Sequence, residues 1–332
     1  MGRRFGLLLG VMLAAGPASG VGRAAQATPQ ATIEMPAYQG RSLDSWLQDL
    51  VCTPCGPAFE PAAEAIRAMG ATAVPYLLQR IERGPHNPLA VTAIRVLGPL
   101  AKGAVPELTA FFRREPSSLS AAMALVYLSA EKPVIDALSS PMPLVRENAI
   151  LALGYGGARV DGAAVPALIA NLEQGSTQTR SNVIWALSMI HKREELVIPA
   201  LLRLADDQDA WIRRSAVGGL GGFSLTRTHA RIITALADPD AGVRGSAARS
   251  LGEGVDTTSD AALVKAIVAA LIVRLNDPVD DVRSHAAWAL GAIGPRAKDA
   301  VGTLTTLTKD ASPQVSQTAT ASLAHINGGT RR

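Results

Sequence analysis

Two cysteines, Cys52 and Cys55, form the C-x-x-C motif "CTPC", which is the part of this sequence best suited to chemistry. Such a pair can close a disulfide, exchange electrons or contribute to a zinc site. A redox-active pair needs its nucleophile at a helix N-terminus, whereas Cys52 follows the expected helix "SLDSWLQDLV", at the helix end that disfavours a thiolate. Zinc would need further ligands, and the sequence has no other cysteine. We therefore expect a structural disulfide between Cys52 and Cys55, with a redox-active pair as the alternative.

Other reactive patterns in the sequence do not extend into sites. The segment "SAEK" at 129–132 has the S-x-x-K spacing of a serine acyl-enzyme, but the partner motifs of that class are missing. "DDQDAW" at 206–211 lacks the glycine and the closing glutamate of a calcium loop. "GGLGGF" at 218–223 follows a helical pattern, whereas a phosphate-binding loop follows a strand. We predict no catalytic residue, no metal ligand and no cofactor.

The N-terminus has the pattern of a secretory signal peptide over residues 1–27. The basic pair Arg3-Arg4 precedes an apolar run of eleven residues from Phe5 to Ala15, which is shorter than the roughly 20 residues of a membrane-spanning helix. Ala25-Gln26-Ala27 then fits the small-residue pattern of a cleavage site. We expect a periplasmic or secreted mature chain that opens with a flexible linker over 28–38, in a compartment that favours disulfides.

The mature chain would carry almost no net charge. Loss of residues 1–27 removes three of the 32 basic residues and none of the 28 acidic ones, which leaves a net charge of +1. No cluster of Lys and Arg remains, so we expect no nucleic-acid binding, and we expect no transmembrane segment. Hydrophobic residues make up 48% of the chain but aromatic residues only 4%, which favours closely packed helices with cores of Ala, Leu, Val and Ile.

One phrase recurs along the chain in a constant register. "DPDAGVRGSAARSLGEG" at 238–254 returns as "DPVDDVRSHAAWALGAIG" from residue 277. Nine such segments align over ten columns, 25 to 39 residues apart. Columns one, five, eight and nine are apolar and fall on one face of a helix, so each segment is predicted to be an amphipathic helix. Column five holds Ala65, Ala93, Ala124, Ala149, Val183, Ala216, Ala247, Ala286 and Ala319.

A second kind of apolar segment lies between these helices and opens with proline. Proline suits the first turn of a helix, where its missing N–H would be unpaired in any case. The prolines are Pro75, Pro106, Pro166 and Pro199. Each repeat is therefore a first helix, a turn and a second helix. Column ten is often glycine, which we expect at the end of the second helix: Gly70, Gly98, Gly154, Gly221, Gly252 and Gly291.

This unit resembles the HEAT repeat, with a Pro-led first helix, a turn Asp-Pro-x-x-x-Val-Arg and a second helix ending Ala-x-x-x-Leu-Gly. The resemblance covers residues 61–326 in about nine repeats and implies an all-α fold, the α-solenoid of stacked antiparallel helix pairs. Single pairs cannot bury their own apolar faces, so they must stack. "YQGRSLDSWLQDL" resembles the helix that caps such arrays in exported bacterial proteins, which places a cap and the CxxC turn at 39–60. A disordered tail is expected over 327–332.

Acidic and basic residues recur six positions apart around the turns. This spacing lets the carboxylate cap the second helix while the guanidinium reaches neighbouring turns. The HEAT resemblance implies that these residues form a ladder that sets the stacking of the repeats. The pairs are Asp207 with Arg213, Asp238 with Arg244, and Asp277 with Arg283.

The resemblance places the second helices along a concave groove, lined by columns three and seven, which point away from the buried face. Column seven reads Arg67, Arg95, Val126, Leu151, Trp185, Gly218, Arg249, Trp288 and Ala321. Leu151 and Trp185 lie on adjacent repeats with Asn148 and Asn182 one turn earlier, so a ring and amides can hold an extended peptide. We expect these four residues and Trp288 to bind a protein or peptide. In the alternative, Trp185 and Trp288 pack between repeats.

The predicted function is a non-catalytic extracytoplasmic scaffold for protein–protein interaction. Deoxyhypusine hydroxylase is an enzyme of HEAT-like repeats whose metal site uses His-Glu pairs, and none of the five histidines here precedes a glutamate. The short repeats also resemble those of phycobilisome lyases. A lyase acting on a tetrapyrrole or another chromophore is therefore one alternative, and a CxxC redox accessory protein is the other.

Overall fold

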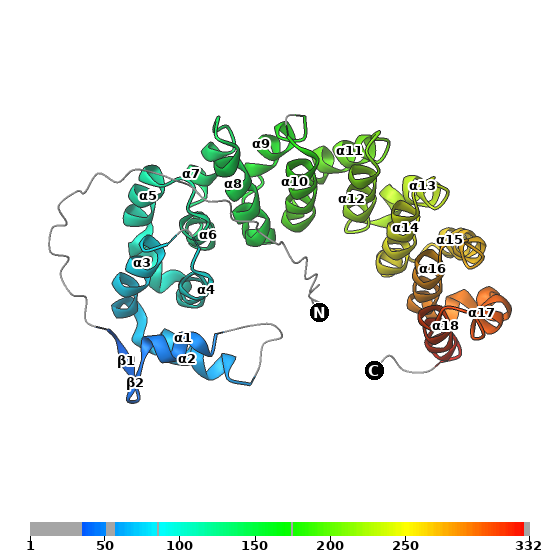
Figure 1. The fold of residues 1–332 in the computed structure, drawn as a ribbon, viewed down its shortest axis with the longest axis horizontal. Coiled ribbons are helices and arrows are strands. Elements are labelled where there is room, and N and C mark those ends of the chain that lie inside the picture. The colour runs from blue at the N-terminus through cyan, green and yellow to red at the C-terminus, as the bar shows by residue number, and fades with distance from the viewer. Residues whose placement is uncertain (1–34, 51–56, 85, 174, 329–332) are drawn as a thin grey trace. The chain divides into compact units, whose positions relative to one another are not determined.

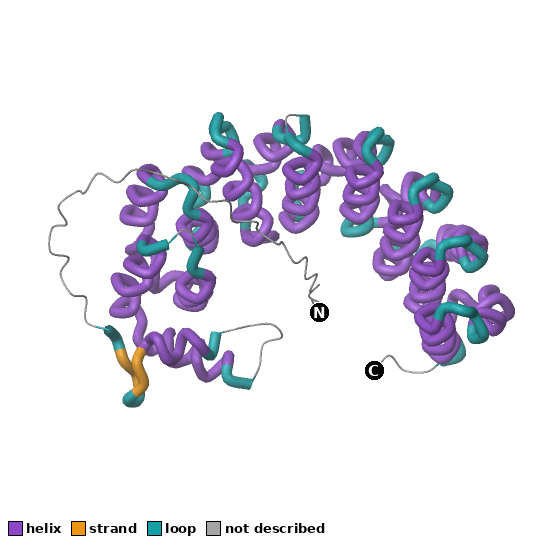
Figure 2. The backbone as a smooth tube through the Cα atoms, in the orientation of Figure 1, coloured by secondary structure: helices purple, strands orange, loops and turns teal. Residues whose placement is uncertain are grey.

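Helices account for nearly all regular structure in residues 35–50, 57–84, 86–173 and 175–328, which are the residues that the computed structural model describes (Figures 1 and 2). The predicted signal peptide, both cysteines and residues 329–332 lie outside these ranges. The helices alternate between two rows, as expected for stacked helix pairs. The all-α solenoid predicted from the sequence is thus confirmed.

One row consists of the first helices of the repeats and the other of the second helices, on opposite sides of the array (Figure 1). The first helices are α3 (Val74–Glu82), α5 (Val105–Arg114), α7 (Lys132–Ala137), α9 (Ala164–Ala170), α11 (Glu194–Leu204), α13 (Leu225–Ala235), α15 (Ala261–Arg274) and α17 (Val301–Leu307). The second helices are α2 (Phe59–Met69), α4 (Pro88–Leu97), α6 (Leu119–Tyr127), α8 (Pro143–Gly156), α10 (Thr177–Ile190), α12 (Ala210–Leu220), α14 (Ala241–Gly254), α16 (Asp280–Ile293) and α18 (Pro313–Ile326). Successive second helices from α2 to α18 pack against one another, and each from α4 to α18 also packs against the first helix that precedes it.

Short 3-10 segments join several second helices to the first helix that follows. They are η1 (Gly70–Ala73), η2 (Gly98–Ala104), η3 (Gly157–Arg159), η4 (Val255–Thr257) and η5 (Gly294–Ala300). Gly70 and Gly98 end α2 and α4 with φ of 58° and 52°, a left-handed conformation that favours glycine. At these two positions the column-ten glycine does end the helix, as the sequence predicts.

Gly221 also ends its helix, as the C-cap of α12, but Gly154, Gly252 and Gly291 lie inside α8, α14 and α16, which corrects the prediction at these three repeats. Both α14 and α16 continue past Gly252 and Gly291 for more than half a turn. A Cβ at Gly252 would lie 2.7 Å from Ala289 Cα, and a Cβ at Gly291 would lie 2.5 Å from Ser322 Oγ. Glycine is required here because the next second helix approaches closely.

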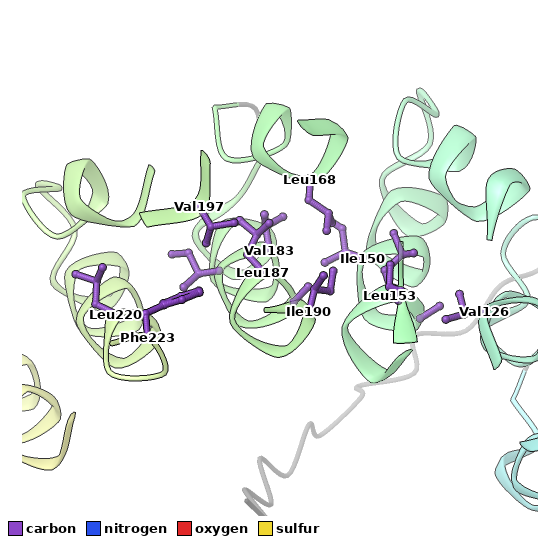
Figure 3. Packing of buried hydrophobic residues seen from close by; sticks show 14 of the residues in the cluster. Val126, Ile150, Leu153, Leu168, Val183, Leu187, Ile190, Val197, Leu220 and Phe223 are labelled. Atoms are coloured by element: carbon purple, nitrogen blue, oxygen red, sulfur yellow. The ribbon is translucent and has the colours of Figure 1, made fainter. Parts of the chain in front are cut away.

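The core lies between the two rows and is built from aliphatic side chains. Ile150 and Leu153 of α8 point toward Leu168 of α9, and Leu187 of α10 lies beside Val197 of α11 (Figure 3). All five side chains are fully buried. Burial of each Leu or Ile contributes roughly 1.5–3 kcal/mol, so each repeat gains stability only when its neighbours cover it.

The N-terminal cap differs from the predicted linker. Ala37–Tyr38 (β1) pairs with Arg41–Ser42 (β2) in an antiparallel hairpin, so the last residues of the expected 28–38 linker are ordered in a sheet. Helix α1 (Leu43–Gln48) follows, and its Trp46 is 8% exposed and donates from Nε1 to Tyr38 O at 3.3 Å. The indole therefore holds the hairpin onto the first repeats.

The predicted prolines lie in the first turn of a first helix at three of the four positions, and the prediction is wrong at Pro199. Pro75 and Pro106 are the second residues of α3 and α5, and Pro166 is the third residue of α9. Helix α11 begins at Glu194, after Arg193 with φ of 53°, so Pro199 lies inside the helix. Pro199 is exposed, which lets the helix tolerate the lost hydrogen bond at its surface.

One segment, 88–114, is long and apolar enough by composition to cross a membrane, with a mean hydropathy of 1.3. The left-handed Gly98 interrupts it, so α4 and α5 are ten residues each and span about 15 Å, half of a bilayer core. Ile94 and Leu108 are buried in the solenoid core. The apolar character of the segment is therefore explained by packing between repeats.

Candidate functional site

Arginine side chains connect consecutive turns across the C-terminal repeats. Arg244 donates to Asp238 O and Pro239 O of its own turn and from Nε and Nη2 to both carboxylate oxygens of Asp277 in the next turn, each at 2.8 Å. The side chains of Arg244 and Asp277 are 11% and 1% exposed. The same pattern joins Arg213 to Asp238 and Arg283 to Asp310. Arg180 donates to Leu172 O and, through Nη2 alone, to Asp207. Each arginine thus binds two repeats together.

The sequence predicts that the aspartates of this ladder cap the second helices, and this prediction is wrong. Asp207 Oδ1 accepts from the N–H of Asp209 at 2.9 Å, and it is Asp209 that caps α12 by accepting from Trp211 N at 2.8 Å. Asp277 likewise accepts from Val279 N at 3.1 Å. The ladder carboxylate therefore shapes the turn, and the residue two positions later begins the helix.

Burial and bonding act in opposite directions on the ladder carboxylates. Burial alone would raise the pKa of Asp277, but the hydrogen bonds from Arg244 and from the Val279 N–H outweigh it and lower the pKa. At Asp310, the hydrogen bond from Arg283 is the main cause of the lowered pKa. The aspartates are thus held as charged partners of the arginines, which is a structural role.

The predicted groove residues Leu151 and Trp185 lie on the adjacent helices α8 and α10. The Trp185 ring covers Gly154, where a Cβ would lie 2.3 Å from Cζ3, and meets Tyr155 edge-to-face with centroids 5.1 Å apart. Trp185 therefore packs between repeats and is also partly exposed beside Tyr155, so both alternatives for this residue contribute.

The predicted amides are already engaged within the protein. Asn148 Nδ2 donates to Ser117 O at 2.7 Å and so secures the turn before α6. Asn182 Oδ1 accepts from Gln178 Nε2 at 2.9 Å on its own helix. Asn148 is therefore tied to the scaffold, while the amide group of Asn182 stays half-exposed beside Trp185.

Trp288 does not join this group, because α12 and α14 lie between α10 and α16 in the row (Figure 1). It is 41% exposed, and its ring lies against Gly252 of α14, where a Cβ would be 3.0 Å from Cζ3. Both tryptophans of column seven thus cover the column-ten glycine of the preceding repeat.

Column three is largely buried, which corrects the expectation that it lines a groove. Its side chains face the next second helix, as in the contact of Ser181 Oγ with Ser215 Oγ at 2.8 Å. Val126 of column seven is also buried, at 2% exposure, because the following helix crosses it at Gly156. The buried members of column three are Ala63, Val91, Ala122, Gly245 and Ser284.

Two exposed residues that the sequence analysis missed complete the surface around Trp185. Tyr155 is 53% exposed and Met189 is 38% exposed, each one turn beyond column seven of its helix. We call Leu151, Tyr155, Trp185 and Met189 the aromatic patch. An i+4 extension of the column-seven stripe would have found Tyr155 and Met189, but the ten-column alignment stops one position short.

Within the described ranges, no group of three or more His, Cys, Asp or Glu is placed to hold a metal ion. A shallow hollow of about 400 Å³ lies between α5 and α7, lined by Phe112, Pro116 and Pro133 among others. It contains none of the predicted site residues. The aromatic patch is therefore the better candidate for a binding surface.

Family models for two repeat types match the sequence. The model described as HEAT repeats matches residues 131–221 and 268–331, and the model described as HEAT-like repeat matches residues 241–293. Together they cover more than half of the 332 residues. No curated protein matches the sequence.

Solved structures of repeat proteins are similar to this chain. Two are crystal structures of engineered proteins from the Northeast Structural Genomics Consortium. One has 20% identity, a TM-score of 0.42 and coverage of 59% of this chain and 96% of its own. The other has 18% identity, a TM-score of 0.45 and coverage of 87% and 89%. A designed armadillo repeat protein has 16% identity, a TM-score of 0.36 and coverage of 76% and 100%.

Proposed function

Because this chain belongs to the HEAT-repeat family, whose solenoids commonly serve as protein-interaction scaffolds, we propose that it is a non-catalytic scaffold that binds protein segments through its second helices. The observation that carries the proposal is the aromatic patch. Tyr155 and Met189 stand 53% and 38% exposed beside the partly exposed Trp185. Clustered exposed apolar side chains on a folded protein are typical of an interaction surface.

The patch has the chemistry to anchor an extended peptide. Aromatic rings give large contact areas at small entropic cost, and such residues dominate the binding energy of interfaces. The half-exposed Asn182 and the exposed Gln178 supply amide groups one to two turns from Trp185. These amides can bond a peptide backbone while the rings contact its side chains.

The scaffold is proposed to act outside the cytoplasm. Support comes from the signal-like sequence of residues 1–27. In the same proposal, Cys52 and Cys55 form a disulfide in the exported protein. The intact mass of protein from a periplasmic fraction should lack the first 27 residues, and its thiols should react with iodoacetamide only after reduction. A full-length mass with free thiols would contradict export and disulfide together.

Photo-crosslinking tests the binding surface in the native cell. The photoreactive residue p-benzoylphenylalanine replaces Tyr155 in one variant and Val273 in a matched control. Val273 is 56% exposed on α15, in the row of first helices. We expect a discrete crosslinked partner from position 155 that is lost when Met189→Ser is added. Equal crosslinking from both positions, or none from position 155, would refute the proposed surface.

A further inference from the structure

Cationic side chains without acidic partners border the aromatic patch on its N-terminal side. The Arg95 guanidinium carbon of α4 lies 5.9 Å from the centroid of the Tyr127 ring on α6. Arg159 of η3 follows Tyr155 by one turn and is exposed. In the described part of the chain, neither Arg95 nor Arg159 forms an ion pair within 4.0 Å, whereas the ladder arginines all do.

Tyr127 joins these cations to the aromatic patch. Burial is the main cause of the raised pKa of Tyr127, while the charges of Arg95 and Arg159 act to lower it and Tyr155 acts to raise it. Tyr127 lies on α6, which packs against α4, the helix of Arg95, and against α8, the helix of Tyr155. Tyr155 in turn contacts Trp185, so one continuous surface runs over α4, α6, α8 and α10.

Acidic side chains in the adjoining loops accept hydrogen bonds from backbone N–H groups. Glu131 Oε1 accepts from Asp161 N at 3.0 Å, and Asp161 Oδ1 accepts from Ala163 N at 2.9 Å. On α8 itself, Glu147 Oε1 accepts from Thr179 Oγ1 at 3.1 Å, two turns away from Tyr155. None of these carboxylates forms an ion pair with Arg95 or Arg159, so the N–H groups of both guanidinium groups are available to a carboxylate of a partner.

We propose that Arg95, Tyr127, Tyr155, Arg159 and Trp185 bind a protein segment in which carboxylate side chains alternate with apolar ones. This inference rests on the proposed function, since it names the class of partner for the same surface. In an extended segment, alternate side chains point to opposite sides, so the apolar ones contact the rings while flanking carboxylates reach the two arginines. A guanidinium binds a carboxylate through two parallel N–H groups, which rewards Asp and Glu over neutral residues.

Single-stranded nucleic acid is a second class of partner, which the experiment below distinguishes from a protein segment. Aromatic rings next to arginines also suit single-stranded nucleic acid, whose bases stack and whose phosphates attract cations. A nucleic-acid strand needs a track of cations along its backbone, however, whereas Arg95 and Arg159 are separate cations on either side of the rings. The acidic, apolar protein segment is therefore the better match.

The experiment uses full-length protein and three fluorescein-labelled peptides of one design. Leu and Phe alternate with Glu in the first peptide, with Gln in the second and with Lys in the third. Fluorescence anisotropy is recorded at about 50 mM and about 300 mM salt, because screening weakens exposed charge pairs. We expect the Glu peptide to bind about tenfold more tightly than the Gln peptide at low salt, and the Lys peptide to bind most weakly.

Charge-neutral variants locate the effect. Arg159→Gln and Arg95→Gln should each lower the affinity for the Glu peptide about threefold, which is the scale of one exposed ion pair, and leave the Gln peptide unchanged. Arg114→Gln on α5 is the matched control, since Arg114 is 72% exposed in the row of first helices. It should change neither affinity.

The outcomes separate this inference from the proposed function. If the Glu and Gln peptides bind equally, or no peptide binds, the acidic partner is refuted, while a crosslink at position 155 would still support the scaffold. If labelled oligo-dT binds and the Arg159→Gln variant loses it, the partner is a nucleic acid and the inference fails. If position 155 gives no crosslink in cells and Trp185→Ala leaves Glu-peptide binding unchanged, both proposals fail.

Discussion

Replacement of Gly252 by alanine tests the close approach of neighbouring second helices. In most helix interiors this change stabilises a protein by up to about 1 kcal/mol, because alanine restricts the unfolded chain and favours the helix. At Gly252 the new Cβ would lie 2.7 Å from Ala289 Cα, 2.9 Å from Ala289 Cβ and 3.0 Å from Trp288 Cζ3. Relief requires a shift of α16, since the nearest atom belongs to its backbone.

The size of the effect follows from two opposing contributions. Overpacking of a tight core costs typically 1–3 kcal/mol, and contact with backbone favours the upper part of that range. Helix propensity returns about 1 kcal/mol. We therefore expect Gly252→Ala to lower the free energy of unfolding by about 1–2 kcal/mol. At an unfolding entropy of about 2.1 cal/mol/K per residue, this corresponds to a fall in Tm of roughly 1.5–3 °C for a chain of this size.

Gly302→Ala is the matched control. Gly302 is in helix α17, and a Cβ there would have no heavy atom within 4 Å. The same chemical change should therefore raise the Tm slightly. Both variants are compared with the wild type by circular dichroism during heating and in urea. If Gly252→Ala melts at or above the wild-type temperature, the helices do not need the missing side chain and the account of column ten is wrong.

Three further predictions concern the ladder and the aromatic patch. Asp277→Ala should cost about 3–5 kcal/mol in urea unfolding because it leaves Arg244 buried and unpaired, whereas the double variant Asp277→Leu/Arg244→Met should cost clearly less; equal costs would contradict a buried pair. The ladder aspartates have lowered pKa values, so their stabilisation is complete above the unfolded pKa of about 3.9 and is lost as the pH falls below it. Hydrogen exchange between about pH 5 and pH 2.5 should then show the repeats from α12 to α18 losing protection, and a pH-independent profile would argue against this. Trp185→Ala should lower stability by about 2 kcal/mol because its ring is only partly buried, whereas Tyr155→Ala should change it by less than about 0.5 kcal/mol in thermal melts; the reverse order would show that the two rings are assigned wrongly.

The sequence predicts the second helices well because their apolar columns repeat with a strong helical period. Ala247, Ala286 and their counterparts in column five are almost all fully buried, as their register requires. The hairpin of β1 and β2 is missed because strands of two residues are too short to show an alternating pattern. The start of α11 is missed because a proline was taken as its first turn, whereas the turn at Arg193 begins the helix earlier.

The candidate site is harder to predict because its details depend on contacts between repeats. Asn148 resembles a binding residue in the sequence, but its amide bonds Ser117 O, which is 31 residues away. The glycines of column ten could be read as helix ends, since only the tertiary structure shows a neighbouring helix against them. The partners of the ladder also depend on tertiary structure: the Arg244 guanidinium binds the carboxylate of Asp277 in the next repeat, and in its own turn it bonds the backbone oxygen of Asp238.

The direction of the ladder has a consequence for how such a chain can change length. Arg213 donates to Asp238 of the next unit, and Arg244 donates to Asp277 of the next unit. Each unit therefore has an aspartate that binds the unit before it and an arginine that binds the unit after it. The Arg–Asp contact between two successive units therefore has the same chemistry each time, although the helix contacts beside it differ. If one whole unit were duplicated or lost, the arginine of one unit would again face the aspartate of the unit after it, so this contact would be restored. The regular spacing of Arg and Asp thus allows the number of repeats to change while the ladder contact is kept.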